Sequence, residues 1–142
     1  QRGSPRQVFE QPNNRFVAAF MGHINLLAGE LIKTNGNGLG CVRLKPGLDV
    51  DAVLTTRPRD GAVVLAVRPN RIRLTEPGGG SHALSGVIKS VKYRGVDVMV
   101  EVTVHDGSSV WVELNAVEGR GLGAGETVAL HWKTQDATIL SA

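Results

Sequence analysis

A chain of 142 residues with 42% hydrophobic and 20% charged residues fits one compact globular domain or two small ones. Its single cysteine, Cys41, excludes an internal disulfide, and no apolar run reaches the length of about 18 residues that a membrane-spanning helix needs. The net charge is +3, but residues 1–85 carry +5 and residues 86–142 carry −2. Because the most strand-rich half is the acidic one, this distribution argues against a nucleic-acid-binding fold.

Helical signals are confined to the opening segment. Ser4 and Pro5 suit the N-cap and first position of a short helix, which Pro12 ends. A second short helix is predicted over 15–21, with Gly22 following it as a C-terminal cap. Both helices are expected to serve packing rather than chemistry.

From residue 25 onward the apolar residues recur with a period of two, which predicts short β-strands. Asn-Gly and Asp-Gly pairs supply the tight turns between them. The clearest hairpin turns at Asp106-Gly107 and places the valines of 96–104 on one face. The predicted strands are 26–32, 40–44, 50–54, 62–67, 71–74, 84–93, 96–104, 110–114, 127–132 and 138–140.

Short, regularly spaced strands favour a mainly β fold, an antiparallel barrel or sandwich, over βαβ units. The 18 glycines agree with many tight turns. The stretch 76–81 is the best candidate for an internal linker, and it divides the β-region into lobes of about 25–75 and 84–142. The sequence leaves open whether these lobes form a pair of barrels or one intertwined unit.

The sequence contains no constellation typical of a catalytic or metal site. The glycine-rich stretches 36–41 and 119–125 precede no predicted helix, and no P-loop motif occurs. The histidines have no second histidine at helical metal-ligand spacing; they are His23, His82, His105 and His131. We therefore expect no catalytic residue, cofactor or metal in this chain.

Single-stranded nucleic acid would need exposed aromatic side chains over a basic groove. Three phenylalanines belong to the helical opening, and the other aromatic residues lie among apolar strand residues, where we expect them mostly in the core. These two groups are Phe9, Phe16 and Phe20, then Tyr93, Trp111 and Trp132.

The opening residues, QRGSPRQVFEQPNNRFVAAFMG, resemble the segment that follows the nucleotide-binding domain of ABC importer ATPases, whose pattern runs roughly Q-x-G-[TS]-P-x-x-[IV]-[YF]-x-x-P-x-N-x-F-V-A-x-F-[IM]-G. Residues 67–74, VRPNRIRL, resemble a second family segment, and 84–88, 93–95 and 128–132 resemble its transport-associated oligonucleotide-binding-like (TOBE) domain. The spermidine/putrescine-type subunits are the most similar subgroup, and maltose-type and ferric-iron-type subunits share the architecture.

This resemblance implies an OB-like β-domain over 25–142, preceded by a helical connector over 1–24 from a nucleotide-binding domain that is absent here. ATP and Mg would bind in that absent domain. The implied role is regulation and homodimerisation of ATPase subunits during uptake of a solute, with a polyamine expected. The parent protein would contact ABC permease subunits and lie in the cytoplasm, peripheral to the inner face of a bacterial plasma membrane, without inserting into it.

Arg68, Asn70 and Arg71 are the candidate interface residues, with a solvated basic turn as the alternative. Asn70 departs from the family pattern, which has Glu there, so any contact made by that carboxylate is in doubt. Two other functions stay open: a β-domain that senses a small solute or oxyanion, and a barrel that binds single-stranded nucleic acid.

Overall fold

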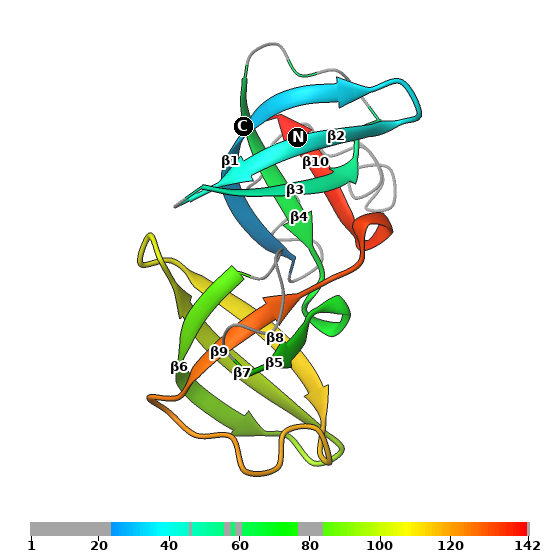
Figure 1. Cartoon of the computed structure of the whole chain (residues 1–142). Coiled ribbons are helices and arrows are strands. Elements are labelled where there is room, and N and C mark those ends of the chain that lie inside the picture. The colour runs from blue at the N-terminus through cyan, green and yellow to red at the C-terminus, as the bar shows by residue number, and fades with distance from the viewer. Residues whose placement is uncertain (1–23, 46, 56–57, 59–60, 77–83, 142) are drawn as a thin grey trace, which may run out of the picture. The chain divides into compact units, whose positions relative to one another are not determined.

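The structure, a computed structural model, describes residues 24–45, 47–55, 58, 61–76 and 84–141. The two predicted helices and the 1–24 connector lie, but for residue 24, outside the described residues. All ten predicted strands are present, most with ends shifted by one to three residues, and Figure 1 shows their arrangement. They are β1 (Asn25–Asn35), β2 (Leu39–Leu44), β3 (Leu48–Val53), β4 (Ala62–Val67), β5 (Arg73–Thr75), β6 (Leu84–Tyr93), β7 (Asp97–Val104), β8 (Ser109–Asn115), β9 (Thr127–His131) and β10 (Ala137–Ser141).

Two short 3-10 helices precede β5 and β10: η1 (Pro69–Arg71) and η2 (Thr134–Asp136). The chain forms two compact units. The first unit holds β1 to β4, η2 and β10, and the second unit holds η1 and β5 to β9.

The first unit is a closed barrel in the order β1-β2-β3-β10-β4. Its ladders are antiparallel, except that β10 and β3 run parallel and pair at Thr138 and Val53. The predicted antiparallel barrel is therefore confirmed here, with one parallel seam. The buried side chains of this barrel include Leu27, Val42, Leu44, Val50, Ala52, Leu65 and Ile139.

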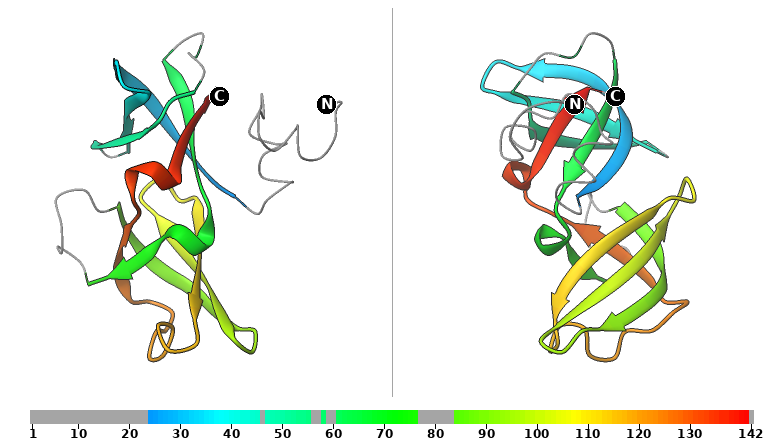
Figure 2. Two further views of the ribbon diagram at one scale, coloured as in Figure 1. Left: turned by 90° about the vertical axis from the view of Figure 1, so that its right-hand side faces the viewer. Right: turned by 180° about the vertical axis from the view of Figure 1, so that it is seen from behind.

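The second unit is a five-stranded antiparallel sheet in the order β5-β9-β6-β7-β8, and Figure 2 shows it from two further sides. Four alternating valines of β7 are buried, as the period of two predicts: Val98, Val100, Val102 and Val104. The prediction was wrong for Val96, which is 84% exposed. It lies in the tight turn that the Arg94 N–H closes on the Asp97 carbonyl at 2.9 Å.

The chain passes between the two units twice, after residue 68 and after residue 132. The strand that follows β4 in the chain, β5, pairs with β9 in the second unit, and the strand that follows β9, β10, pairs with β4 in the first unit (Figure 1). The predicted lobe 25–75 holds β1 to β4 of the first unit and also β5, which belongs to the second unit. The predicted lobe 84–142 holds β6 to β9 of the second unit and also β10, which belongs to the first unit. Each of these two strands therefore pairs in the unit opposite to its predicted lobe.

The same close backbone contact recurs in both units. A Cβ placed on Gly29 of β1 would lie 2.6 Å from Val42 Cγ1 and 3.1 Å from the Arg43 carbonyl oxygen. A Cβ on Gly86 of β6 would collide with Val102 Cγ1 and lie 2.9 Å from the Thr103 carbonyl oxygen. Glycine is needed at both positions because the neighbouring strand occupies the space of a side chain.

Candidate interaction surfaces

The predicted interface residues Arg68, Asn70 and Arg71 lie on the short segment that joins β4 to β5, and all three are exposed. Pro69 and Ile72, which alternate with them, are buried. Proline fixes φ at a value that suits a 3-10 turn, and the Ile72 N–H donates to the Pro69 carbonyl at 3.4 Å. Two buried anchors therefore hold a run of polar side chains at the surface, and its role as an interface stays a prediction.

Arg73, the first residue of β5, fixes the backbone of this segment. Its Nη1 donates to the carbonyls of Asn70 at 3.2 Å and Ile72 at 3.3 Å. Its Nε lies 3.9 Å from the Glu118 carboxylate. The spacing of charges in the sequence gave no sign of these bonds, because they depend on the 3-10 turn.

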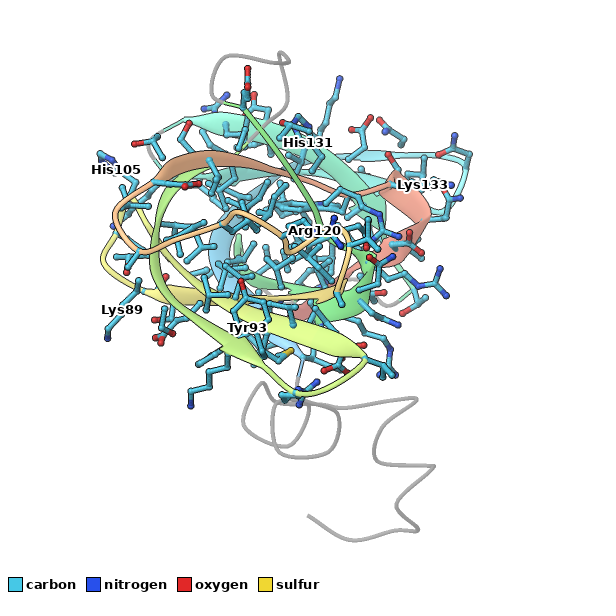
Figure 3. The ribbon with its side chains drawn as sticks, turned by 90° about the horizontal axis from the view of Figure 1, so that it is seen from below. Lys89, Tyr93, His105, Arg120, His131 and Lys133 are labelled. Carbon is cyan, nitrogen blue, oxygen red and sulfur yellow. The ribbon has the colours of Figure 1, made fainter. Side chains whose placement is uncertain are left out.

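A polar cluster lies on the sheet face opposite the buried valines. Its centre is Glu101 of β7, whose carboxylate accepts hydrogen bonds from Ser109 Oγ at 2.6 Å and Ser90 Oγ at 3.3 Å. Lys89, whose side chain points away from the ribbon in Figure 3, brings Nζ within 3.7 Å of the same carboxylate. The Ser109 hydrogen bond outweighs the effect of burial and lowers the pKa of Glu101. A carboxylate held in its charged form suits electrostatic binding or structure, not proton donation.

One end of the second unit carries exposed apolar side chains. Tyr93, Val96 and Val117 are the three most exposed large hydrophobic residues described, at 63%, 84% and 71%. The Ala116 N–H donates to the Val96 carbonyl at 3.2 Å, so the turn before β7 and the loop after β8 lie together. The expectation that Tyr93 lies mostly in the core was wrong: it is the last residue of β6, whose final two residues are both exposed, and Figure 3 labels it. No pattern in the sequence predicted this surface.

Two small networks fix the shape of that end. Arg94 donates to both carboxylate oxygens of Asp97, at 2.9 and 3.1 Å, and lies 3.6 Å from Glu113. Asn115 and Glu118 each accept a hydrogen bond from the other's backbone N–H, at 2.7 and 3.1 Å. The apolar side chains are therefore carried by ordered turns. The other predicted core aromatics, Trp111 and Trp132, are half-buried.

Titratable residues are dispersed. Within the described ranges no three His, Cys, Asp or Glu side chains gather as metal ligands would. His131 Nε2 lies 2.6 Å from Thr75 Oγ1, His105 is exposed in a turn, and His23 and His82 lie outside the described residues. Burial raises the pKa of the Cys41 thiol, and Asp49 and Asp51 act in the same direction. A thiol in this state is a poor nucleophile.

Of the helices in the described part of the chain, none has the length and apolar character that crossing a membrane requires.

A family model described as the TOBE domain matches residues 65–140. Among curated proteins, the chain is 33% identical over 144 residues to "Spermidine/putrescine import ATP-binding protein PotA" of Pseudomonas fluorescens (strain Pf0-1), covering 100% of this chain and 39% of the relative. It is 32% identical over 141 residues to "Fe(3+) ions import ATP-binding protein FbpC" of Brucella abortus (strain 2308), covering 99% of this chain and 38% of the relative.

A solved structure of the cytoplasmic molybdate-binding protein ModG, with molybdate bound, has the same fold. The TM-score is 0.72 at 18% identity, and the match covers 83% of this chain and 96% of that one. The chain spans about a third to two fifths of the length of the curated relatives it matches. Since the family model takes in more than half of the chain and the relatives align along nearly all of it, the chain belongs to the TOBE domain family.

Proposed function

We propose that this chain is the regulatory and dimerisation domain of the ATP-binding subunit of an ABC importer, with a polyamine as the transported solute. In this proposal it is non-catalytic and acts on ATPase domains that lie in the remainder of the subunit. The subunit would bind its permease at the inner face of the plasma membrane.

The observation that carries the proposal is the alignment with importer subunits over the whole chain. Relatives whose names give spermidine and putrescine as solutes are 33% identical over 100% and 99% of the chain. A ferric-iron importer subunit aligns nearly as well, at 32%. The importer role is therefore better supported than the choice of polyamine.

Dimerisation gives such a domain a physical purpose. Two ATPase domains must separate and close again in each cycle, and a domain pair that stays together keeps their effective concentration high while they are apart. This role needs an accessible surface with a fixed shape, not a reacting group. The segment of Arg68, Asn70 and Arg71 offers one, because Pro69 and Ile72 anchor it.

Sedimentation of the purified chain over a range of concentrations tests the proposal, and a reversible monomer–dimer equilibrium is expected. The variant Asn70→Lys adds a positive charge to an already basic segment, so like charges would face each other in a symmetric dimer. We expect its dimer to dissociate at least about tenfold more readily, which corresponds to about 1.4 kcal/mol.

The chain offers a matched control. Gln135 occupies the same place in η2 that Asn70 occupies in η1, and it is also exposed. Gln135→Lys adds the same charge to the other unit and should leave the dissociation constant unchanged. A chain that stays monomeric at all concentrations would contradict the dimerisation role, and equal effects of the two variants would remove Asn70 from the interface.

A second candidate, sensing of a small solute or oxyanion, is favoured by the fold shared with a structure that carries molybdate. Calorimetric titration with spermidine, putrescine, molybdate and sulfate separates the two functions. Heat of binding for one of these compounds would support sensing, and its absence for all four would leave dimer control alone.

A further inference from the structure

The turn between β1 and β2 contains two Asn-Gly pairs in succession, Asn35-Gly36 and Asn37-Gly38. We propose that Asn37 is a modification site, at which the neutral side-chain amide converts spontaneously to a carboxylate. The chemistry needs water and the neighbouring peptide group only.

The reaction takes place in two steps. The backbone nitrogen of Gly38 attacks Cγ of Asn37, the Cγ–Nδ2 bond breaks, and ammonia leaves with the proton of the Gly38 amide. Water then opens the resulting cyclic imide at either carbonyl. One opening gives aspartate, and the other gives isoaspartate, in which the main chain runs through Cγ. No oxidant or reductant takes part.

The structure leaves the nucleophile free to reach the side-chain carbonyl. Gly36, Asn37 and Gly38 are all exposed, and a Cβ placed on either glycine would meet no heavy atom within 4 Å. Gly38 has a φ of +83°, a conformation that glycine adopts without steric cost. No hydrogen bond to any described residue holds the Asn37 side chain. The amide nitrogen of Gly38 and Cγ of Asn37 can therefore approach each other without displacing packed atoms.

The fold distinguishes Asn37 from Asn35, although the two have the same local sequence. Asn35 is the last residue of β1, is half-buried, and pairs with Leu39 across the ladder. It must leave the ladder before its backbone can adopt the geometry for cyclisation. An opening that costs about 1.4 kcal/mol slows the reaction about tenfold.

The hairpin of the second unit provides an internal comparison. Gly107 has a φ of +86° and equally open surroundings, but it follows Asp106. Asp106 Oδ1 accepts hydrogen bonds from the Ser108 N–H at 3.0 Å and from Ser108 Oγ at 2.5 Å. A carboxylate anion is a poor electrophile, and these bonds hold it against Ser108, so Asp106 should be stable where Asn37 reacts.

The modification would alter the edge of the barrel. The Gly38 carbonyl accepts the Leu54 N–H at 2.9 Å, which ties the turn to the residue after β3. Isoaspartate at position 37 lengthens the main chain directly before Gly38 and is expected to break this bond. Both products also place a new negative charge in the turn.

The test is incubation of the folded chain in mildly alkaline buffer, followed by peptide mapping for the mass gain of amide hydrolysis and by enzymatic labelling of isoaspartate. We expect product at Asn37 at least about tenfold faster than at Asn35 in the folded chain. In concentrated urea the two sites should react at similar rates, because the ladder is gone. Equal rates in the folded chain, or reaction at Asn37 only after unfolding, would overturn the proposal.

Two variants complete the test. Asn37→Gln should abolish the product at position 37, since cyclisation of the longer side chain is slower, and Asn35→Gln should leave the rate at Asn37 unchanged. Asn37→Asp carries the charge without the longer main chain. Faster amide exchange at Leu54 in the aged protein, but not in Asn37→Asp, is the expected signature of isoaspartate, and equal exchange in both would contradict that effect on the barrel.

Discussion

The two units arrange their strands in a similar order but differ in the side chains that the strands present. In both, one long strand shifts register at a bulge, between Leu31 and Lys33 in β1 and between Ile88 and Ser90 in β6. The residues directly across from the bulges do not match. Lys33 faces Cys41 in the first unit, whereas Ser90 faces Glu101 in the second.

This difference separates what fixes the backbone from what is free to diverge. Gly29 and Gly86, at equivalent places before the bulges, both lack room for a side chain. Cys41 is buried with a raised pKa, and Glu101 sits in a polar cluster with a lowered pKa. The close-packed positions are therefore repeated, while the chemistry on the other face is specific to each unit.

The largest effect is expected from truncating the central core leucines. Leu65 pairs with Leu27 and Ile139, Leu130 occupies the same place in the second unit, and both are 0% exposed. Leu65→Ala and Leu130→Ala should each lower the free energy of unfolding by about 2–5 kcal/mol, measured in urea. A loss below about 1 kcal/mol at one position only would show that the two cores are not equivalent.

The next largest effect concerns the close contacts of the glycines. Gly29→Ala and Gly86→Ala should each cost about 1–3 kcal/mol, because the Cβ collides with a valine on the next strand and presses on its backbone. Gly123→Ala is a matched control, since its nearest neighbour is the end of a flexible side chain, Glu126 Oε1, 4.0 Å away.

A second substitution sharpens this comparison. Replacing the valine that the new Cβ meets, as in Gly86→Ala with Val102→Ala, should give a smaller loss than the sum of the single changes. Additive losses would mean that the backbone contact with Thr103, not the valine side chain, sets the cost.

Local periodicity predicted most of this fold. The alternation of valines around Val100 specified β7 and its buried face, and Asp106-Gly107 specified the turn that follows. The end of the hairpin was mispredicted at Val96 and Tyr93, because the alternation of apolar and polar residues continues in the sequence into the turn between β6 and β7. Exposure at a strand end depends on what covers it, which no local pattern records.

Local periodicity could not predict that β5 and β10 pair in the opposite units, nor could it predict the candidate surfaces. The sequence places β5 next to β4 and β10 next to β9, and only long-range pairing, Leu74 with Leu130 and Ile139 with Leu65, assigns each to the other unit. Likewise, Ser109 could not be linked to Glu101 without the register of β7 and β8. The sequence shows these residues but not which of them lie next to each other in the fold.

A smaller, pH-dependent effect is expected at Glu101. Its pKa is lowered in the folded chain, so the stability it contributes is present at neutral pH and is lost as the pH falls through the folded pKa. Glu101→Gln should lower the urea midpoint at neutral pH and bring wild type and variant together in acid. A pH-independent difference for Glu101→Gln would exclude the carboxylate as its cause.

The smallest effect is expected where the units differ at their surfaces. Arg43 donates to both oxygens of Asp49 across β2 and β3, at 2.7 and 3.0 Å, and the corresponding pair in the second unit is Thr103 and Ser109. The hydrogen bonds of Arg43 lower the pKa of Asp49, so the pair contributes to stability at neutral pH and contributes less in acid.

Arg43→Ala should shift the urea midpoint least of all these variants, because both side chains are exposed to screening by salt. Salt that shortens the Debye length from about 8 Å to about 3 Å should remove most of that shift. A shift that survives high salt would assign the effect to packing of the arginine stem. In that case the ion pair would stabilise the first unit no more than Thr103 and Ser109 stabilise the second.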